Sequence, residues 1–315
     1  MTQQNPRPFL KWVGGKGQLI PQMERFFPLE FNDYYEPFVG AGAVFFWLYR
    51  NKKLKDQIIL NDKNSELINC YRVIKDDPEA LISDLKKHKY EKEYYMDIRN
   101  ADRNLERFDK WTDIKKASRT IYLNKTCFNG LYRLNKKGQF NVPMGKYKNP
   151  TICDEDNLRA IHKALENVTI VCGDFQDCLK DVEVDDFVYF DPPYHPLSAT
   201  ARFTSYTRDK FTKKDQRRVY GSFRYLSKRE CYALLSNSYC DFVLDLYKKF
   251  YIETIMAKRS INRDADKRGK IREILVMNKK IRDIMRKEKI LNTMDVLNFF
   301  KKVGRVTVRK KSNRI

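Results

Sequence analysis

The sequence predicts an α/β protein with a doubly wound, Rossmann-like sheet that is interrupted by an inserted helical and β-hairpin domain. Short runs of β-branched and aromatic residues recur along the 315-residue chain, and helical patterns separate them. Several of these runs end in an acid or a glycine turn, at the edge where open α/β sheets bind ligands. Between Ser65 and Tyr147 the runs give way to charged helical patterns and a glycine hairpin.

The composition predicts a polyanionic partner. The chain carries 63 Lys and Arg against 41 Asp and Glu, a formal net charge of +22, and cationic surfaces gain affinity for nucleic acids by releasing phosphate counterions. A membrane surface is the other candidate, but the sequence has neither an 18-residue apolar run nor an opening basic amphipathic helix. We therefore expect a nucleic-acid partner and no membrane.

The cysteines and the first residues predict a cytoplasmic protein without a metal site. Seven cysteines form no C-x-x-C pair and only three histidines are present, so a zinc site is not expected and the thiols suit a reducing compartment. Residues Met1 to Pro8 are polar, so we expect no secretory signal.

The first motif places two glycines and Lys16 before a predicted helix from Gly17 to Phe27. Free N–H groups and the helix dipole at such a start favour an anion, although the spacing is not that of a P-loop. A tight turn with a solvated lysine is the alternative.

A strand, a glycine turn and a helix are predicted from Tyr34 to Leu48, with Gly40 and Gly42 in the turn. Glycines there let the backbone approach a ligand closely, although the full dinucleotide fingerprint is missing. The next strand, Gln57 to Asp62, places an acid about 20 residues after the glycines, where acids commonly bond ribose hydroxyls. The turn and the acid together predict an adenosyl ligand.

The segment from Ser65 to Asn124 has a helical period, and we expect three or four helices outside the sheet. Within Asn124 to Tyr147, Gly138 flanked by alternating apolar and polar residues predicts a hairpin. Basic residues alternate there with aromatic residues and asparagines, which suits a ribbon that reads a DNA groove. A surface hairpin with a solvated basic face is the alternative.

The sheet pattern resumes with Val168 to Phe175, whose final Asp174 and Phe175 could bond an adenine amino group and cover its ring. The next run, Asp186 to Phe190, predicts a buried strand, and Asp191-Pro192-Pro193-Tyr194 follows it directly.

The chain must leave the sheet at this motif, because proline lacks an N–H and fixes φ. The Asp191 carboxylate and the Pro192 carbonyl could both accept hydrogen bonds from one planar amino group, while Tyr194 stacks on the ring that carries it. The motif predicts a site for the exocyclic amine of a base. A plain strand stop is the alternative.

Three further strands are predicted, at Cys231–Asn237, Phe250–Ala257 and Ile271–Met277. We also expect a polar loop at Leu197–Phe211 and an exposed basic loop at Arg259–Lys270. The 37 residues after Asn278 carry 13 Lys or Arg against three acids. We expect a helix from Leu291 to Phe300 that docks on the body and directs Arg305 to Arg314 at DNA flanking the site. A solubilising or disordered terminus is the alternative.

The order of these motifs resembles the Dam-type (D12 class, alpha group) site-specific N6-adenine DNA methyltransferases, over about Arg7 to Asn278. The matching motifs are Phe9-Leu10-Lys11-Trp12-x-Gly14-Gly15-Lys16, Phe38-x-Gly40-x-Gly42, Asn129-Gly130-Leu131-x-Arg133, Phe140-Asn141-Val142-Pro143-x-Gly145 and Asp191-Pro192-Pro193-Tyr194. The chain departs from the family at Phe128, often Tyr in relatives, and at Arg202, where many relatives carry Asn or a small residue. The basic tail has no counterpart in the family pattern.

The resemblance implies S-adenosyl-L-methionine as the methyl donor and duplex DNA, modified at GATC, as the substrate. Its implied donor site comprises Trp12, Lys16, Phe38, Gly40, Gly42, Asp62, Asp174, Phe175 and Asp191. Its implied catalytic group is Asp191, Pro192, Pro193 and Tyr194, acting on a base flipped out of the duplex without a metal. Its implied DNA-reading residues are Lys11, Phe128, Asn129, Leu131, Arg133 and Pro143.

We expect residues 1–85 and 161–278 to form a discontinuous catalytic domain that binds S-adenosylmethionine. Residues 86–160 would form the target-recognition domain, and residues 279–315 a basic C-terminal extension. The alternatives are methylation of another amine (cytosine N4, RNA or a protein amide) and a catalytically silent DNA-binding protein. The sequence leaves open whether this nucleoid-associated, cytoplasmic protein accompanies a restriction endonuclease or acts alone.

Overall fold

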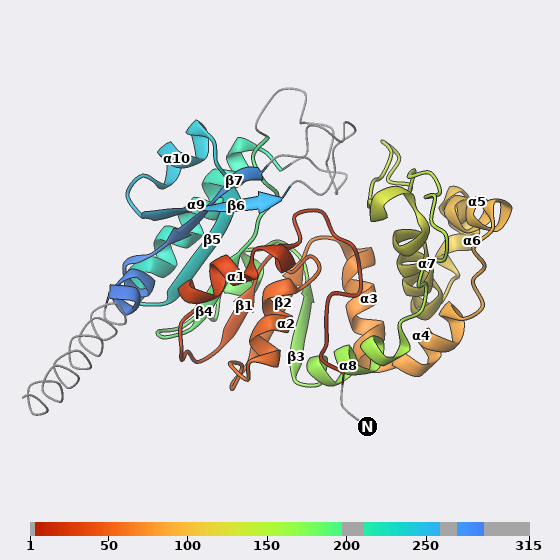
Figure 1. The fold of residues 1–315 in the computed structure, drawn as a ribbon, viewed down its shortest axis with the longest axis horizontal. Helices are drawn as coiled ribbons and strands as arrows, with labels where there is room; N and C mark the ends of the chain where they lie inside the picture. Colours follow the sequence, from red (N-terminus) through yellow and green to blue (C-terminus); the bar gives the residue numbers. More distant parts are fainter. Residues whose placement is uncertain (1–3, 197–210, 259–269, 287–315) are drawn as a thin grey trace, which may run out of the picture.

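A seven-stranded sheet forms the centre of the computed structural model, which describes residues 4–196, 211–258 and 270–286 (Figure 1). The strands are β1 (Tyr34–Glu36), β2 (Ile58–Asp62), β3 (Val168–Cys172), β4 (Phe187–Phe190), β5 (Tyr232–Ser238), β6 (Tyr251–Lys258) and β7 (Lys270–Met277). Their order is β3-β2-β1-β4-β5-β7-β6, and only β7 runs antiparallel to its neighbours. The chain reverses its direction of winding between β1 and β4, so a switch point lies there and the predicted doubly wound sheet is confirmed.

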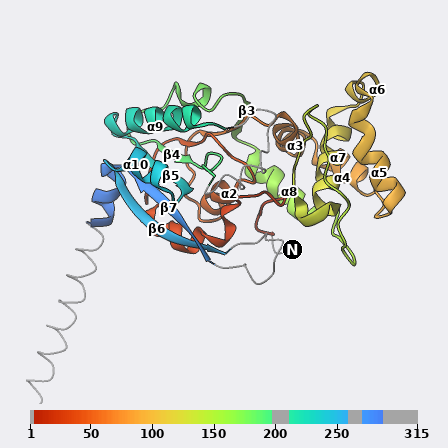
Figure 2. The same cartoon turned by 90° about the horizontal axis from the view of Figure 1, so that it is seen from above.

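Helices cover both faces of this sheet (Figure 2). The α-helices are α1 (Ile20–Met23), α2 (Ala43–Arg50), α3 (Ser65–Asp76), α4 (Pro78–Leu85), α5 (Lys92–Asn100), α6 (Leu105–Asp109), α7 (Asp113–Thr126), α8 (Glu155–Leu165), α9 (Lys213–Lys228) and α10 (Asp241–Tyr247). Helices α2, α3 and α8 pack on one face, whereas α9 and α10 pack on the other.

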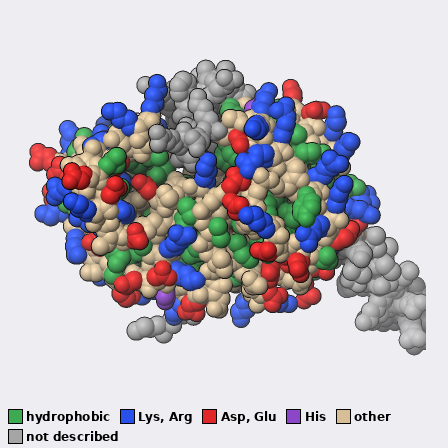
Figure 3. Space-filling view, turned by 180° about the vertical axis from the view of Figure 1, so that it is seen from behind, with side chains coloured by type: hydrophobic (Ala, Val, Ile, Leu, Met, Phe, Trp, Pro, Cys, Tyr) green, Lys and Arg blue, Asp and Glu red, His purple; other side chains and the backbone are tan. Residues whose placement is uncertain are grey.

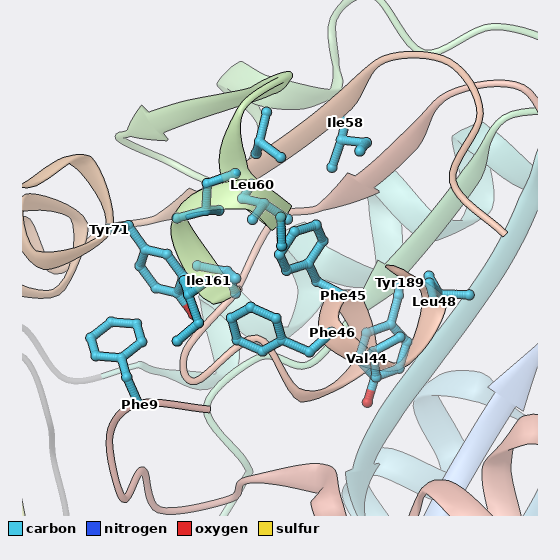
Figure 4. Close-up of a cluster of buried hydrophobic side chains, with 14 of the residues drawn as sticks. Phe9, Val44, Phe45, Phe46, Leu48, Ile58, Leu60, Tyr71, Ile161 and Tyr189 are labelled. Atoms are coloured by element: carbon cyan, nitrogen blue, oxygen red, sulfur yellow. The ribbon is translucent and has the colours of Figure 1, made fainter. Parts of the chain in front are cut away.

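Neighbouring residues of one strand enter opposite cores, which explains why the strands read as continuous apolar runs. In β4, Phe187 and Tyr189 join the core beneath α2 and α3, while Val188 and Phe190 join the core beneath α9 and α10. Figure 4 shows side chains of the first core, from strands and from α2, α3 and α8, meeting in one cluster. A parallel sheet buried on both faces has this pattern.

Two predictions about helices are wrong in detail. Gly17 to Phe27 does not form one helix: two short 3-10 turns flank the four-residue α1, because a glycine and Pro21 weaken continuous helical hydrogen bonding. Ser65 to Asn124 contains parts of five α-helices rather than three or four, and α3 packs on the sheet instead of outside it. Its apolar stripe, which includes Leu67 and Tyr71, joins the core.

The predicted hairpin is present, but it is irregular. In residues 127–147, here called the recognition hairpin, two isolated bridges pair Cys127 with Met144 and Leu134 with Phe140. Gly138 has the positive φ that its predicted turn needs (78°). The recognition hairpin lies with helices α4 to α7 to one side of the sheet (Figure 1).

Three predicted features lie wholly or almost wholly outside the described residues: the polar loop from Leu197 with Arg202, the basic loop from Arg259, and the tail with its helix at 291–300 and its arginines at 305–314. Within the described part of the chain, no helix is long and apolar enough to cross a membrane.

Candidate active site

A cavity of about 360 Å³ opens at the carboxyl ends of the parallel strands β1 to β4. The predicted donor-binding and catalytic residues all line it: Trp12, Lys16, Phe38, Gly40, Gly42, Asp62, Asp174, Phe175, Asp191, Pro192, Pro193 and Tyr194. The structure therefore brings these twelve residues together from five separate segments of the chain. A volume of this size suits a small-molecule ligand.

Asp191 is held by a lysine from the first motif. Lys16 Nζ lies 2.8 Å from Asp191 Oδ1 and donates to the Gly14 carbonyl at 2.6 Å. The Lys16 side chain is 3% exposed, and the lysine neutralises a carboxylate of the protein. The predicted anion site at this turn stays a prediction. Among the described residues, no donor bonds Asp191 Oδ2.

The electrostatics of Asp191 balance burial against this lysine. Burial raises the pKa of Asp191 to about 6, although Lys16 lowers it, and the charge of Glu273 adds to the increase. The carboxyl group is therefore ionised at neutral pH and becomes protonated in mildly acidic solution.

The residues after β4 are here called the β4 loop (191–196), and hydrogen bonds with other elements hold it in place. The Pro193 carbonyl accepts from Gln216 Nε2 at 2.8 Å, and the Tyr194 hydroxyl donates to Glu273 Oε2 at 2.7 Å. Within the described structure, no donor reaches the Pro192 carbonyl. The β4 loop therefore keeps two acceptors, Asp191 Oδ2 and the Pro192 carbonyl, that no hydrogen-bond donor of residues 4–196, 211–258 or 270–286 reaches.

A second carboxyl group, Glu36, lies in the same cavity and was not predicted. It ends β1, and the Tyr34 hydroxyl donates to its Oε2 at 2.8 Å. Burial raises the pKa of Glu36 to about 8, and the charge of Asp191 contributes to the increase. Glu36 is therefore largely neutral at pH 7, beside a carboxylate that is ionised.

The glycine turn joins the first two strands at the pocket. Gly40 and Gly42 have positive φ values of 48° and 68°, and the Gly40 N–H donates to Asp62 Oδ2 at 3.1 Å. A Cβ on Gly42 would lie 2.8 Å from the Tyr71 hydroxyl, and one on Gly40 would lie 3.1 Å from Trp12 Cδ1. These close contacts are with side chains of the protein, so packing within the protein also requires glycine at both positions.

The far wall of the cavity is aromatic and carries an unpredicted arginine. Phe38 and Phe175 stack with ring centroids 5.1 Å apart. Arg218 from α9 lies over the Phe175 ring at 4.9 Å and donates to Asp174 Oδ1 at 2.7 Å. Asp174 therefore shares its acceptor oxygen with an arginine, and a ligand amino group would have to compete with it or use Oδ2.

The predicted DNA-reading residues lie outside the cavity, around a tight turn of the recognition hairpin. Asn129 and Gly130 have φ values of 57° and 63°, and the Leu131 N–H donates to the Phe128 carbonyl at 3.2 Å, as in a type I′ turn. The Phe128 N–H donates to the Pro143 carbonyl at 2.9 Å, and the Phe128 ring is 50% exposed.

Asn124 joins Lys11 to this turn, and sequence reasoning missed it. Its Nδ2 donates to the carbonyls of Lys11 (2.8 Å) and Gly130 (3.0 Å), and its Oδ1 accepts from the Lys11 N–H at 2.8 Å. Asn124 is 2% exposed, so the carboxamide is fully used. The first motif and the recognition hairpin, far apart in the sequence, are thus held side by side.

Arg133 lies further along the same hairpin and is exposed. Its Nε donates to Asn141 Oδ1 at 2.7 Å, which holds the guanidinium to the opposite arm of the hairpin. On the face in Figure 3, Lys and Arg side chains are widely spread and acidic side chains lie among them.

Some of the site residues that were not predicted follow a recognisable sequence pattern, and others do not. Glu36 ends a strand with an acid, as Asp62 does, so the same rule could have found it. Gln216 and Arg218 lie on a helix whose inward face depends on tertiary packing, and no local pattern identifies them.

Comparisons with known proteins agree with these motifs. Residues 12–261 match the family model described as D12 class N6 adenine-specific DNA methyltransferase. The Type II methyltransferase M1.LlaDCHI of Lactococcus lactis subsp. cremoris is 47% identical over 278 residues, covering 87% of this chain and 96% of that protein. The Type II methyltransferase M.MjaIII of Methanocaldococcus jannaschii is 46% identical, covering 86% and 99%. The DNA adenine methylase of Escherichia coli K12 is 33% identical, covering 87% and 95%.

Proposed function

The chain belongs to the D12 class N6 adenine-specific DNA methyltransferases, and from this premise we propose that it methylates N6 of an adenine flipped out of duplex DNA at GATC. Membership of a methyltransferase family implies S-adenosyl-L-methionine as the methyl donor. The observation that supports the target chemistry is a pair of acceptors in the β4 loop, Asp191 Oδ2 and the Pro192 carbonyl, which receive no hydrogen bond from the part of the chain that the structure describes.

The residues of the cavity fit this donor. Asp62 ends β2 within reach of ribose hydroxyls, and its carboxylate is fixed by the Gly40 N–H. Phe38 and Phe175 offer an aromatic wall against which an adenine could lie, with Asp174 as the acceptor for its amino group. When bound, the donor supplies an electrophilic methyl group on its sulfonium sulfur.

The β4 loop would prepare the target nitrogen for this methyl group. The N6 lone pair of adenine is delocalised into the ring and is a poor nucleophile. Acceptance of both N6 hydrogens, by Asp191 and the Pro192 carbonyl, favours a pyramidal nitrogen whose lone pair is available. The new N–C bond forms as the S–C bond breaks, and the extra N6 proton leaves afterwards, to Asp191 or water.

Tyr194 would bind the flipped base by one face only. Its hydroxyl is fixed by Glu273, and Lys16 Nζ lies over its ring, 4.6 Å from the centroid. A base could therefore stack only on the opposite face. Flipping costs a few kcal/mol, which stacking on an aromatic ring offsets by about 1–3 kcal/mol.

Asp191→Ala tests the proposal. We expect the affinities for S-adenosylmethionine and for duplex DNA to stay within about tenfold, while single-turnover methyl transfer falls by at least about 10²-fold, the effect of losing an electrostatic stabiliser. The measurement is transfer of labelled methyl groups to a duplex with one GATC. Turnover near that of the unchanged protein would reduce the motif to a strand stop. If titration of the unchanged protein with S-adenosylmethionine detects no binding, a catalytically silent DNA-binding protein would be favoured.

The target sequence GATC rests on the turn of the recognition hairpin and on Lys11. The DNA-reading residues named above are exposed or half-buried there, so they are accessible to base edges. Digestion of treated DNA with nucleases that distinguish methylated from unmethylated GATC tests this assignment. Full cleavage by a nuclease that methylation blocks would show that the target is another sequence or another amine.

The cellular context is also a proposal. A chromosomal substrate places the protein in the cytoplasm, at the nucleoid. Two relatives are named Type II methyltransferases, which supports a companion restriction endonuclease with the same target. A host lysate that cuts unmethylated duplex, but not duplex treated with this protein, would show such a nuclease.

A further inference from the structure

The β4 loop is held at one point by a side chain that lies outside its motif. Gln216, in the first turns of α9, is fully buried (0% exposed). Its Nε2 donates to the Pro193 carbonyl at 2.8 Å, and its Oε1 accepts from Asn237 Nδ2 at 3.0 Å. One carboxamide therefore joins the β4 loop, helix α9 and strand β5.

The orientation of this carboxamide follows from the hydrogen-bond pattern. Asn237 Oδ1 accepts from the Ser238 N–H at 2.8 Å, so the Asn237 nitrogen faces Gln216. Gln216 must then present its oxygen to Asn237 and its nitrogen to Pro193, because a carbonyl can only accept. Asn237 and Pro193 together therefore determine that the Gln216 nitrogen, not its oxygen, faces the Pro193 carbonyl.

Helix α9 does not itself need this amide. The helix begins with a capping box between Thr212 and Asp215, and Val219 and Phe223 supply its apolar packing. A buried polar side chain costs free energy unless it is paired, and an apolar side chain of similar length would satisfy the packing alone. The chemistry of the Gln216 amide serves the β4 loop and β5.

We propose that Gln216 is a positioning residue for methyl transfer. By holding the Pro193 carbonyl, it fixes the peptide plane between Pro193 and Tyr194, and with it the neighbouring Pro192 carbonyl. That carbonyl then keeps its place beside Asp191 before the target amine arrives. The inference rests on the proposed function, because it assigns Gln216 a role in the chemistry of that motif.

The variant Gln216→Glu tests the donor specifically. At pH 8 the glutamate is ionised and has no hydrogen to donate. Its oxygen would face the oxygen of the Pro193 carbonyl, and because the two repel each other, the carbonyl should turn away. We expect kcat to fall roughly 10–100-fold, the scale of one buried hydrogen bond with an unsatisfied partner. Dissociation constants for S-adenosylmethionine and cognate duplex should change less than about threefold.

Acid should rescue this variant. A protonated carboxyl group can donate to the Pro193 carbonyl and still accept from Asn237. The ratio of kcat between Gln216→Glu and the unchanged protein should therefore rise as the pH is lowered from about 8 to about 6. Asp191 titrates in both proteins, and an ionised carboxylate at position 216 would raise the pKa of Asp191 in the variant. That shift would lower the ratio in acid, so it cannot produce the rescue.

No other titratable group bonds the Gln216 amide among the described residues. The neighbouring charged and titratable side chains include Asp215, Arg217 and Arg218 on α9, Asp191, Tyr194 and His195 in the β4 loop, and Arg272 and Glu273 on β7. All of them are present in both proteins, so a change in the ratio arises from the carboxyl group at position 216, including its effect on the charge of its neighbours.

Asn278→Asp is the matched control. Asn278 is also a buried carboxamide, and its Nδ2 donates to the Cys231 carbonyl at 2.7 Å, beyond the opposite end of β5. The same amide-to-acid change there should leave kcat within about twofold, with thermal unfolding followed by circular dichroism for every variant. Should Gln216→Glu not fold, Gln216→Met removes the same donor without a charge and should show the loss of kcat without rescue by acid.

The outcomes separate the two proposals. A kcat within threefold of the unchanged protein at pH 8, or a loss that acid does not reverse in the folded Gln216→Glu protein, would overturn the role of Gln216. Asp191→Ala is run in the same assay: if it remains inactive, the proposed function stands while the inference about Gln216 falls. If Asp191→Ala is active, the proposed function falls first.

Discussion

The cavity and the recognition hairpin are held in place by different kinds of contact. Around the cavity, several key side chains are paired with other side chains, as Lys16 is with Asp191 and Tyr194 with Glu273, although Gln216 and Asp62 bond backbone groups there. In the recognition hairpin, the bonds run from buried side chains to backbone atoms. Examples are Asn124 to two carbonyls and the Tyr95 hydroxyl to the Val142 carbonyl at 2.9 Å.

The same kind of anchor recurs along the recognition hairpin. The Tyr90 hydroxyl donates to the Gly145 carbonyl at 2.6 Å. Asp102, paired at 2.8 Å with the buried Arg119, accepts from the Phe140 N–H at 2.8 Å. None of these bonds depends on the exposed side chains at the tip of the turn.

This difference has a functional consequence. A hairpin held by its backbone can change its exposed residues, and so the bases it reads, without losing its position. A cavity held by paired side chains cannot exchange one member without leaving the other unpaired and buried. We therefore expect substitutions in the cavity to remove activity, and substitutions at the turn to alter the choice of DNA.

The largest effect is expected from Lys16→Met. It leaves the Asp191 carboxylate buried without its cation, so the pKa of Asp191, already raised to about 6, should rise further. At neutral pH we expect kcat to fall by at least about 10²-fold, and the acid limb of the pH–rate profile to move to higher pH. Lys55→Met, at an exposed pair with Glu30, is the control and should leave the profile unchanged. An unshifted limb would show that Asp191 does not set it.

Next in size is Asn124→Leu, which removes the anchor between Lys11 and the recognition hairpin. Three backbone groups lose their partner, and each buried unsatisfied group costs about 1–3 kcal/mol. We expect cognate DNA affinity to fall on the order of 100-fold while affinity for S-adenosylmethionine stays within a few-fold. Fluorescence anisotropy and donor titration measure the two. Equal loss of both affinities would mean that Asn124 supports the whole fold, and the cavity and the recognition hairpin would not be held in place separately.

A smaller and more selective effect is expected from Arg133→Ala. The arginine is exposed, and within the described structure its hydrogen bonds go to Asn141 alone, so its loss should leave the hairpin in place. Affinity for GATC duplex should fall by about 1–3 kcal/mol, as for an arginine that reads guanine, and affinity for a scrambled duplex should fall less. Lys136→Ala, an exposed cation of the same hairpin, is the control and should weaken both duplexes alike. Equal losses for Arg133→Ala would make it a phosphate contact.

The difference between the cavity and the recognition hairpin also explains which features the sequence could predict. Acids at the ends of parallel strands, such as Asp62 and Asp191, meet because topology gathers strand ends at one edge, so local patterns were sufficient. The partner of Asp191 could not be read in this way: Lys16 had the pattern of an anion site, and only the packing of the first motif against the β4 loop turns it to the carboxylate.

The helical part was predicted less well for a related reason. The helical pattern from Ser65 onwards contains no mark that separates α3, which packs on the sheet, from α5 to α7, which lie beside the recognition hairpin. The backbone anchors were also invisible. A buried asparagine such as Asn124 has the same local appearance in a sequence as a solvated one.

The smallest effect concerns Glu36, which tests whether the cavity keeps one carboxyl group neutral beside an ionised one. Burial raises the pKa of Glu36 from 4.5 to about 8, so between these values the folded protein holds a proton that the unfolded chain has released. The free energy of unfolding should therefore decrease as pH rises through this window, by at most about 1.4 kcal/mol per pH unit. Glu36→Gln cannot titrate and should flatten that decrease.

Urea unfolding at about pH 7 and about pH 8 measures the slope where Asp191, whose pKa is about 6, is mostly ionised. Glu30→Gln, at a side chain that is 83% exposed, is the control and should keep the slope of the unchanged protein. If Glu36→Gln also keeps that slope, Glu36 is ionised in the folded protein and must share the charge of Lys16 with Asp191. The lysine would then hold two carboxylates, and Asp191 would be less firmly fixed than the paired geometry implies.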